Sequence, residues 1–147
     1  GTTKWEHTLP ASGGIPSIGS DGTIYVNVIG VGLQALSSGQ LKWTAGDGSP
    51  GALELAIAAD GTIYSTLFHS STQSSFTAVN PDGSIRWILG VPSEGGSPAI
   101  GSDGTIYVTG GCMPGVLTAV YGSSPLASSS WPRGRCGNRN TGCYGEY

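Results

Sequence analysis

Short runs of alternating apolar and polar residues, separated by glycine-rich turns, recur along the chain. The clearest run is Thr105-Ile106-Tyr107-Val108, which directly follows Asp103-Gly104. Alternation over a few residues is the pattern of a half-buried strand, and Asp-Gly between two such runs is a signal for a tight hairpin. Helical spacing of apolar residues has almost no support in this sequence, so the pattern predicts an all-β chain of short strands.

One pentapeptide, Asp-Gly-Thr-Ile-Tyr, occurs three times, at 21–25, 60–64 and 103–107. The copies are spaced by about 40 residues, which indicates a repeat architecture. A residue that recurs with the repeat is first a building part of the fold and only then a candidate site. Around the copies we expect inner strands at 15–19, 54–58 and 97–101, second strands at 23–26, 62–65 and 105–108, and third strands at 33–36, 76–79 and 116–120.

A fourth strand in each repeat is marked by Gly-x-x-(Lys/Arg)-Trp. The motif ends at Trp43 and at Trp87, and it occurs once more at the start of the chain, ending at Trp5, whereas none follows Val120. Four short antiparallel strands in about 40 residues are typical of a β-propeller blade. We therefore predict about three four-stranded antiparallel blades in a partial or oligomer-completed ring, with Gly1–Trp5 as an outer strand that completes another blade.

Two segments carry a family resemblance. Residues 97–108 read Ser-Pro-Ala-Ile-Gly-Ser-Asp-Gly-Thr-Ile-Tyr-Val, and residues 77–87 read Thr-Ala-Val-Asn-Pro-Asp-Gly-Ser-Ile-Arg-Trp. They resemble the pyrroloquinoline-quinone-like repeat family, bacterial propellers related to quinoprotein alcohol dehydrogenases and outer-membrane assembly lipoproteins. Residues 124–142 also resemble the segment that ends many such propellers, although 133–138 depart from the family's pattern. The resemblance implies a β-propeller of six to eight blades.

The chain is accordingly interpreted as PQQ-like blades over 1–121 and a Ser/Gly-rich C-terminal tail over 122–147. Three blades are too few for a closed ring, because natural propellers use about four to eight. Two explanations stay open. The chain is the C-terminal part of a longer protein, or copies assemble, either as two chains in a six-bladed ring or as an open filament built by donation of the Gly1–Trp5 strand.

Composition restricts the partners. The net charge is −3, the isoelectric point is near 5.1 and only 10% of residues are charged, which argues against nucleic acid. No apolar run approaches the roughly 20 residues of a membrane-spanning helix. A disulfide between Cys136 and Cys143, in a loop rich in Gly, Asn and Thr, fits an extracellular, periplasmic or cell-surface setting. Cys112 would then be buried or paired with another chain.

The candidate chemistry is sparse. Asp21, Asp60 and Asp103 each precede a glycine, where a carboxylate accepts backbone hydrogen bonds in a turn. No Asp-x-Asp-x-Asp loop, catalytic elbow or phosphate-cradling loop is present, so we expect no catalytic, cofactor-binding or metal-binding residues. Trp5, Trp43 and Trp87 occupy equivalent positions, which favours packing between blades, with the tyrosines of the pentapeptide in the same role.

The function favoured by the sequence is a non-enzymatic extracellular scaffold or interaction module. Its partner would be itself or the missing blades of the same protein, with self-assembly into a ring or filament by strand donation. The resemblance implies a first alternative, a fragment of a quinone-dependent dehydrogenase. A second alternative is a glycan-binding propeller that uses aromatic residues at the blade edges and recognises a glycan or a cell-surface protein.

Overall fold

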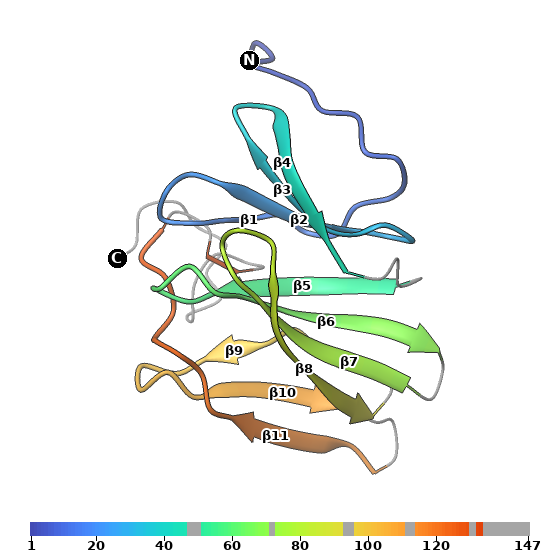
Figure 1. The fold of residues 1–147 in the computed structure, drawn as a ribbon, viewed down its shortest axis with the longest axis vertical. Helices are drawn as coiled ribbons and strands as arrows, with labels where there is room; N and C mark the ends of the chain where they lie inside the picture. The colour runs from blue at the N-terminus through green and yellow to red at the C-terminus, as the bar shows by residue number, and fades with distance from the viewer. Residues whose placement is uncertain (47–50, 71–72, 93–95, 111–113, 130–131, 134–147) are drawn as a thin grey trace.

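A computed structural model of the chain describes residues 1–46, 51–70, 73–92, 96–110, 114–129 and 132–133. The described residues form eleven strands and contain no helix. The all-β prediction is therefore confirmed. The strands form three antiparallel sheets, which follow one another along the long axis of the molecule in the order of the sequence (Figure 1).

Each sheet runs in sequence order from an inner edge strand outward. The first sheet contains β1 (Ser17–Ile18), β2 (Ile24–Val28), β3 (Gly32–Ser37) and β4 (Gln40–Ala45). The second contains β5 (Gly51–Ile57), β6 (Ile63–Ser70), β7 (Gln73–Val79) and β8 (Ile85–Pro92). The third has three strands, β9 (Ala99–Ile100), β10 (Ile106–Gly110) and β11 (Val116–Val120).

The Asp-Gly turns connect the first two strands of each sheet. In the first sheet Asp21 accepts a hydrogen bond from the backbone N–H of Thr23 at 2.9 Å and another from its hydroxyl at 2.7 Å. An aspartate that bonds its own backbone two residues on fixes the turn locally. The same carboxylate-to-backbone bond recurs in the other two sheets, between Asp60 and Thr62 and between Asp103 and Thr105.

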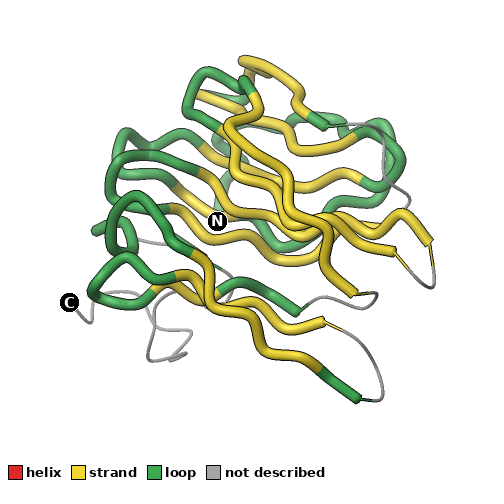
Figure 2. Tube along the Cα trace, turned by 60° about the horizontal axis from the view of Figure 1, so that its bottom comes forward, coloured by secondary structure: helices red, strands yellow, loops and turns green. Residues whose placement is uncertain are grey.

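Equivalent residues stand in equivalent cross-strand rows. Tyr25 pairs with Ala35, which pairs with Trp43, across β2, β3 and β4. The second sheet repeats this row as Tyr64, Ala78 and Trp87. In the third sheet the row ends after Tyr107 and Ala119, because β11 has no outer neighbour among the described residues. The tube view shows the strands of the three sheets lying side by side, joined by loops and without helices (Figure 2).

The core lies between the sheets. One buried cluster joins the first sheet to the second and includes Tyr25, Leu33 and Ile63. Another joins the second sheet to the third and includes Phe76 and Ile106. The second sheet is therefore apolar on both faces, and it is stabilised by burying those faces against the first and third sheets.

The segment after β11 returns to the second sheet and lies along the free edge of β5. The N–H of Ala127 donates to the carbonyl of Ile57 at 2.8 Å, and the N–H of Ile57 donates to the carbonyl of Pro132 at 2.9 Å. Because β5 is the edge strand of its sheet, this segment satisfies backbone groups that would otherwise be open to pairing. Part of the predicted tail is thus bound to the inner edge of the second sheet.

We expect Phe76→Ala to lower the free energy of unfolding by about 3–5 kcal/mol, the usual cost of emptying a buried aromatic site. Phe76 is fully buried and contacts the rings of Tyr64 and Trp87 at centroid distances of 6.0 and 5.6 Å. Urea titration followed by tryptophan fluorescence measures the change. Ile88→Ala, on the same sheet but 60% exposed, is the matched control and should cost less than about 0.5 kcal/mol. Equal losses for the two variants would contradict the assignment of the core.

Candidate functional site

Consecutive sheets meet through two kinds of face. We call the face that a sheet turns toward the next sheet its trailing face, and the face turned toward the preceding sheet its leading face. At the first junction the trailing face includes Tyr25, Leu33, Ala35 and Trp43, and the leading face of the second sheet includes Leu55, Ile57, Ile63 and Val79. At the second junction the trailing residues are Tyr64, Phe76, Ala78 and Trp87, and the leading residues are Ile100, Ile106, Val108 and Val120.

The outer-strand tryptophan connects both sides of the first junction. Trp43 packs against Tyr25 of its own sheet, with ring centroids 5.8 Å apart. Its indole N–H donates to the carbonyl of Pro81, in the outer hairpin of the next sheet, at 3.0 Å. Gly83 in that hairpin has φ +91°, and a Cβ there would lie 2.8 Å from the Trp43 ring. The ring therefore lies directly on the backbone of Gly83, where the Cβ of any other residue would clash with it.

A buried polar contact also crosses this junction. The side-chain amide of Asn27 donates to the hydroxyl of Ser65 at 2.8 Å, and both residues are buried. At the second junction the hydroxyl of Thr66 donates to the carbonyl of Gly96 at 3.2 Å. Such bonds satisfy polar groups that would be costly to bury alone, and they add directional contacts to the apolar packing of the sheets.

The trailing face of the third sheet is exposed. Tyr107 is 40% exposed, whereas its equivalents Tyr25 and Tyr64 are 3% and 1% exposed. Leu117 is 67% exposed, whereas Leu33 and Phe76 in the same row position are 2% and 0% exposed. The residue types are those of a buried junction, so this end of the molecule presents a core-like surface to solvent.

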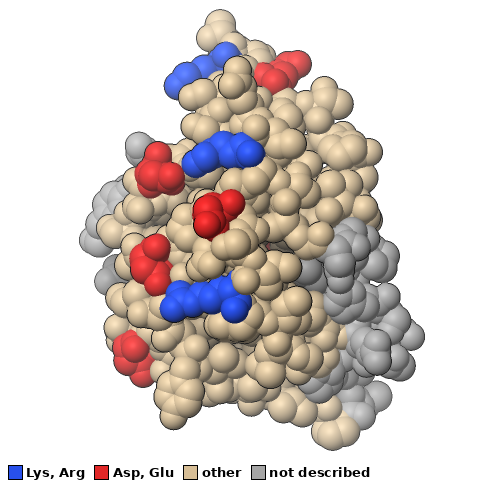
Figure 3. All heavy atoms as spheres, viewed as in Figure 1, with Lys and Arg blue, Asp and Glu red and all other residues tan. Residues whose placement is uncertain are grey.

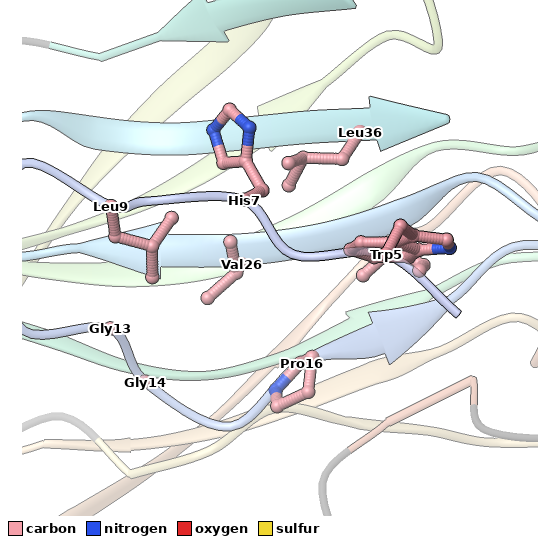
Figure 4. A pocket seen from close by; sticks show the side chains of 9 residues that line it. Trp5, His7, Leu9, Gly13, Gly14, Pro16, Val26 and Leu36 are labelled. Carbon is pink, nitrogen blue, oxygen red and sulfur yellow. The ribbon is translucent and has the colours of Figure 1, made fainter. Parts of the chain in front are cut away.

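The leading face of the first sheet is only partly covered. Its residues Pro16, Ile24, Val26 and Leu36 occupy the positions that Leu55, Ile63, Ser65 and Val79 hold in the second sheet. The N-terminal arm, residues 1–12, passes over this face without forming a strand, and Leu9 packs on the cluster that contains Val26 and Leu36. An open pocket of about 380 Å³ remains between the arm and the sheet (Figure 4).

Trp5 lies on the first sheet as Trp43 lies on the second. A Cβ at Gly39 would stand 3.1 Å from the Trp5 ring, and Gly39 has φ +79°. The ring nitrogen Nδ1 of His7 lies 3.2 Å from the carbonyl oxygen of Gly39. Trp5 therefore occupies the position that an outer-strand tryptophan of a preceding sheet would take. The strand expected over Gly1–Trp5 is not formed in the isolated chain, which contains no preceding sheet for it to join.

The cation before each outer-strand tryptophan lies over the pentapeptide of its own sheet. Lys42 Nζ donates to the hydroxyl of Thr23 at 3.3 Å, and Arg86 donates to the hydroxyl of Thr62 at 3.2 Å. Arg86 also stands 3.6 Å from a carboxylate oxygen of Asp60. The ion pair between Arg86 and Asp60 is exposed, so it contributes little to stability. Positive and negative side chains lie interspersed on this face of the molecule (Figure 3).

The turn carboxylates are held in their charged form. The backbone N–H and the hydroxyl of Thr23 lower the pKa of Asp21, and Lys42 lowers it further. The same two groups of Thr105 lower the pKa of Asp103. At Asp60 burial raises the pKa, but hydrogen bonds from Ser123 and Thr62 outweigh burial and leave the pKa below its ordinary value. Each carboxylate is an acceptor fixed by its turn.

The other residue types singled out in the sequence give no reactive cluster. Within the described ranges, no group of three or more His, Cys, Asp or Glu side chains is placed to hold a metal ion. No helix in the part of the chain that the structure describes has the length and apolar character needed to cross a lipid bilayer. Cys112, Cys136 and Cys143 lie outside the described residues, so the disulfide stays a prediction.

The sequence pattern pointed to the tryptophans but not to the two end faces. Tyr107 and Leu117 carry the same residue types as their buried equivalents, and their exposure follows only from the position of the third sheet at the end of the stack. For the leading face a signal did exist. Pro16 and Ile24 align with Leu55 and Ile63 once the pentapeptides are superposed. The equivalence of Leu36 and Val79 follows only from the strand pairing, because the second repeat is longer between these strands.

No model of a protein family matches the chain, and no curated protein is significantly similar to it.

We expect Gly83→Ala to destabilise the chain by more than Gly22→Ala. Both glycines have positive φ, +91° and +80°, so an alanine at either site carries the backbone strain of about 1–2 kcal/mol. Only at Gly83 does the new methyl group meet a ring, that of Trp43 at 2.8 Å; at Gly22 nothing lies within 4 Å. The difference between their urea midpoints isolates the tryptophan contact. Equal midpoints would show that Trp43 does not rest on the hairpin of the second sheet.

We expect stability to fall in acid through the turn aspartates. A carboxyl whose pKa is lowered on folding contributes stability that is present above the ordinary value of 3.8 and is lost as the pH falls through the lower folded value. The urea midpoint should therefore decline from pH 5 toward pH 2. Asp21→Asn removes one such group, so its decline should be shallower than that of the wild type, and parallel curves would contradict the assignment.

Proposed function

We propose that this chain is a non-enzymatic interaction module made of β-propeller blades, which works as an extracellular scaffold by joining further blades at its two end faces. The observation that carries the proposal is the exposure of Tyr107 and Leu117, whose equivalents are buried at both internal junctions. An exposed surface made of the residue types that are buried elsewhere in the molecule has the composition of a docking surface.

The propeller assignment is supported by the uniformity of the junctions. Both junctions use a tyrosine, a tryptophan and an alanine on one side and β-branched or leucine side chains on the other. The two complete sheets have the same strand order and the same Tyr–Ala–Trp row. A stack in which every junction is alike can be extended by one more copy of the same unit, as blades are in a propeller.

The energetics favour docking at both ends. Fully burying one leucine-sized side chain contributes about 1.5–3 kcal/mol, and the trailing face offers Leu117 and Tyr107 together. The leading face offers Ile24, Pro16 and the pocket beneath Trp5. The two faces are complementary because they are the two halves of the junction that the chain forms twice internally.

The alternative of a quinone-dependent dehydrogenase finds no support in the described residues. In the enzymes that the sequence resembles, the quinone lies at the ring centre, toward which the inner strands are turned. Here the inner edge of β5 is hydrogen-bonded to the chain's own segment around Ala127. The glycan-binding alternative would use exposed aromatic residues, and Tyr107 and Tyr121 are exposed. Tyr107, however, belongs to a row that is buried in both complete sheets.

We expect the 147-residue chain to associate, with a mass by light scattering above the 14.8 kDa of one copy. Tyr107→Arg should weaken the association about tenfold or more, because a charge would be buried in the junction. Ile88→Arg is the matched control, since Ile88 is exposed on the middle sheet, and it should leave the mass unchanged.

A single 14.8 kDa species at every concentration would overturn the proposal of self-assembly. Dye-linked oxidation of an alcohol or sugar after addition of pyrroloquinoline quinone and calcium would instead support the dehydrogenase. Retention on a glycan array that Tyr107→Arg abolishes, without any association of copies, would support the glycan-binding module.

A further inference from the structure

We propose that residues 3–8 of one copy form a fourth strand on the third sheet of a second copy, which has three strands among the described residues. In this arrangement Trp5 lies opposite Ala119. The inference rests on the proposed function and deepens it, because it names the segment that joins the copies and its register. It predicts a mixed sheet of β9, β10 and β11 from one copy and the N-terminal arm from the other.

The third sheet has an open place where the outer strand lies in the other two. A pocket of about 220 Å³ there is lined by Thr105, Ala119, Val120 and Tyr121. In the first sheet the equivalents of the first three are Thr23, Ala35 and Leu36, and β4 covers all of them: Lys42 bonds Thr23, Trp43 pairs with Ala35, and Leu41 pairs with Leu36.

The edge of β11 is suited to pairing. Its sequence, Val-Leu-Thr-Ala-Val, carries no charge and no proline, whereas edge strands that must stay unpaired are usually protected by such residues. Val116, Leu117 and Ala119 are exposed along it. An extended segment added to this edge would satisfy the open backbone groups and cover the apolar side chains at the same time.

The complete sheets give the register. Both have a bulge at the cation: Trp43 pairs with Ala35 while Leu41 pairs with Leu36, which leaves Lys42 between them. The second sheet repeats this with Trp87 on Ala78, Ile85 on Val79 and Arg86 between them. Transferred to the third sheet, the pattern places Trp5 opposite Ala119, Thr3 opposite Val120, Glu6 opposite Thr118 and Thr8 opposite Val116.

The bulge also gives Lys4 a partner. Lys42 and Arg86 each reach the threonine hydroxyl of the pentapeptide in their own sheet. In the third sheet the equivalent groups are the hydroxyl of Thr105 and the carboxylate of Asp103, which are bonded to each other at 2.8 Å and exposed. Lys4 of the copy that donates the arm would lie over them.

Trp5 already makes half of its contacts in the isolated chain. A junction tryptophan touches the tyrosine of its own sheet and the outer hairpin of the next sheet, as Trp43 touches Tyr25 and Gly83. Trp5 lies on the hairpin at Gly39. The tyrosine in the matching place is Tyr107 of the second copy, so strand addition brings the exposed trailing face of one copy onto the leading face of the other.

The donor must be another copy. The N-terminus lies at one end of the stack and β11 at the other, with the second sheet between them (Figure 1). Trp5 is also held on the first sheet of its own chain, so the arm cannot reach β11 of the same molecule while it keeps that contact. The interface is therefore heterologous, head to tail.

Disulfide trapping tests the register. In a background with Cys112, Cys136 and Cys143 changed to serine, Glu6→Cys is mixed with Thr118→Cys, and Thr8→Cys with Val116→Cys. Directly opposed residues of an antiparallel pair have Cα atoms about 4.5–5.5 Å apart, within the range that a disulfide spans. Both mixtures should give a disulfide-linked dimer under mild oxidation.

The matched controls exchange the partners. Glu6→Cys mixed with Val116→Cys, and Thr8→Cys mixed with Thr118→Cys, place the sulfurs on a diagonal beyond disulfide reach and should give about tenfold less dimer. Equal yields from all four mixtures would overturn the register. No linked dimer in any mixture, from chains that light scattering shows to be associated, would overturn strand addition while leaving the proposed function in place.

A second measurement needs no change to the native cysteines. Lys4→Glu would face Asp103 with a like charge, and Trp5→Ala would remove the ring from Tyr107, so both should raise the dissociation constant several-fold. Thr2→Ala, in the same arm but outside the inferred pairing, is the control. Unchanged dissociation constants for all three variants would contradict the inference, and a single-copy mass for the wild type would contradict the proposed function as well.

Discussion

Burial of one sheet's face against the next is the interaction on which the rest of the structure depends. Each sheet has apolar side chains on both faces, so neither face can be left to water without a loss of hydrophobic stabilisation. The tryptophan of the outer strand fixes how far apart two sheets stand, because its ring lies on a glycine of the next hairpin. A similar contact, between Trp5 of the N-terminal arm and Gly39, is made at the leading face of the first sheet.

The local elements could be predicted from the sequence because their causes are local. An aspartate followed by glycine bonds the backbone two residues on, so the turn at Asp21 needs no distant partner. Alternation around Tyr64 predicts a strand there, and β6 forms at that place, although the structure buries both of its faces and not one. The absence of a Gly-x-x-Lys-Trp motif after Val120 also predicted that the third sheet would end at three strands, as the described residues do.

Contacts made at a distance could not be predicted in this way. The segment around Ala127 carries no strand pattern, yet it lies along β5, because the backbone of an edge strand accepts almost any extended neighbour. The exposure of Tyr107 could not be predicted either, because the burial of a side chain depends on the residues around it and not on its own type. Of the tyrosines in the three copies of the pentapeptide, two therefore lie in the core and one lies on the surface.

The two ends of the stack are matched because they are the halves of one repeated junction. A chain that used its end faces only as a surface toward water would be expected to place charges there, as edge strands usually do. The N-terminal arm carries two charged residues, Lys4 and Glu6, whereas β11 has none. A charged arm stays hydrated when it is unpaired, and an uncharged edge gains most when it is covered. This difference between donor and acceptor is what the proposed head-to-tail pairing of the two ends requires.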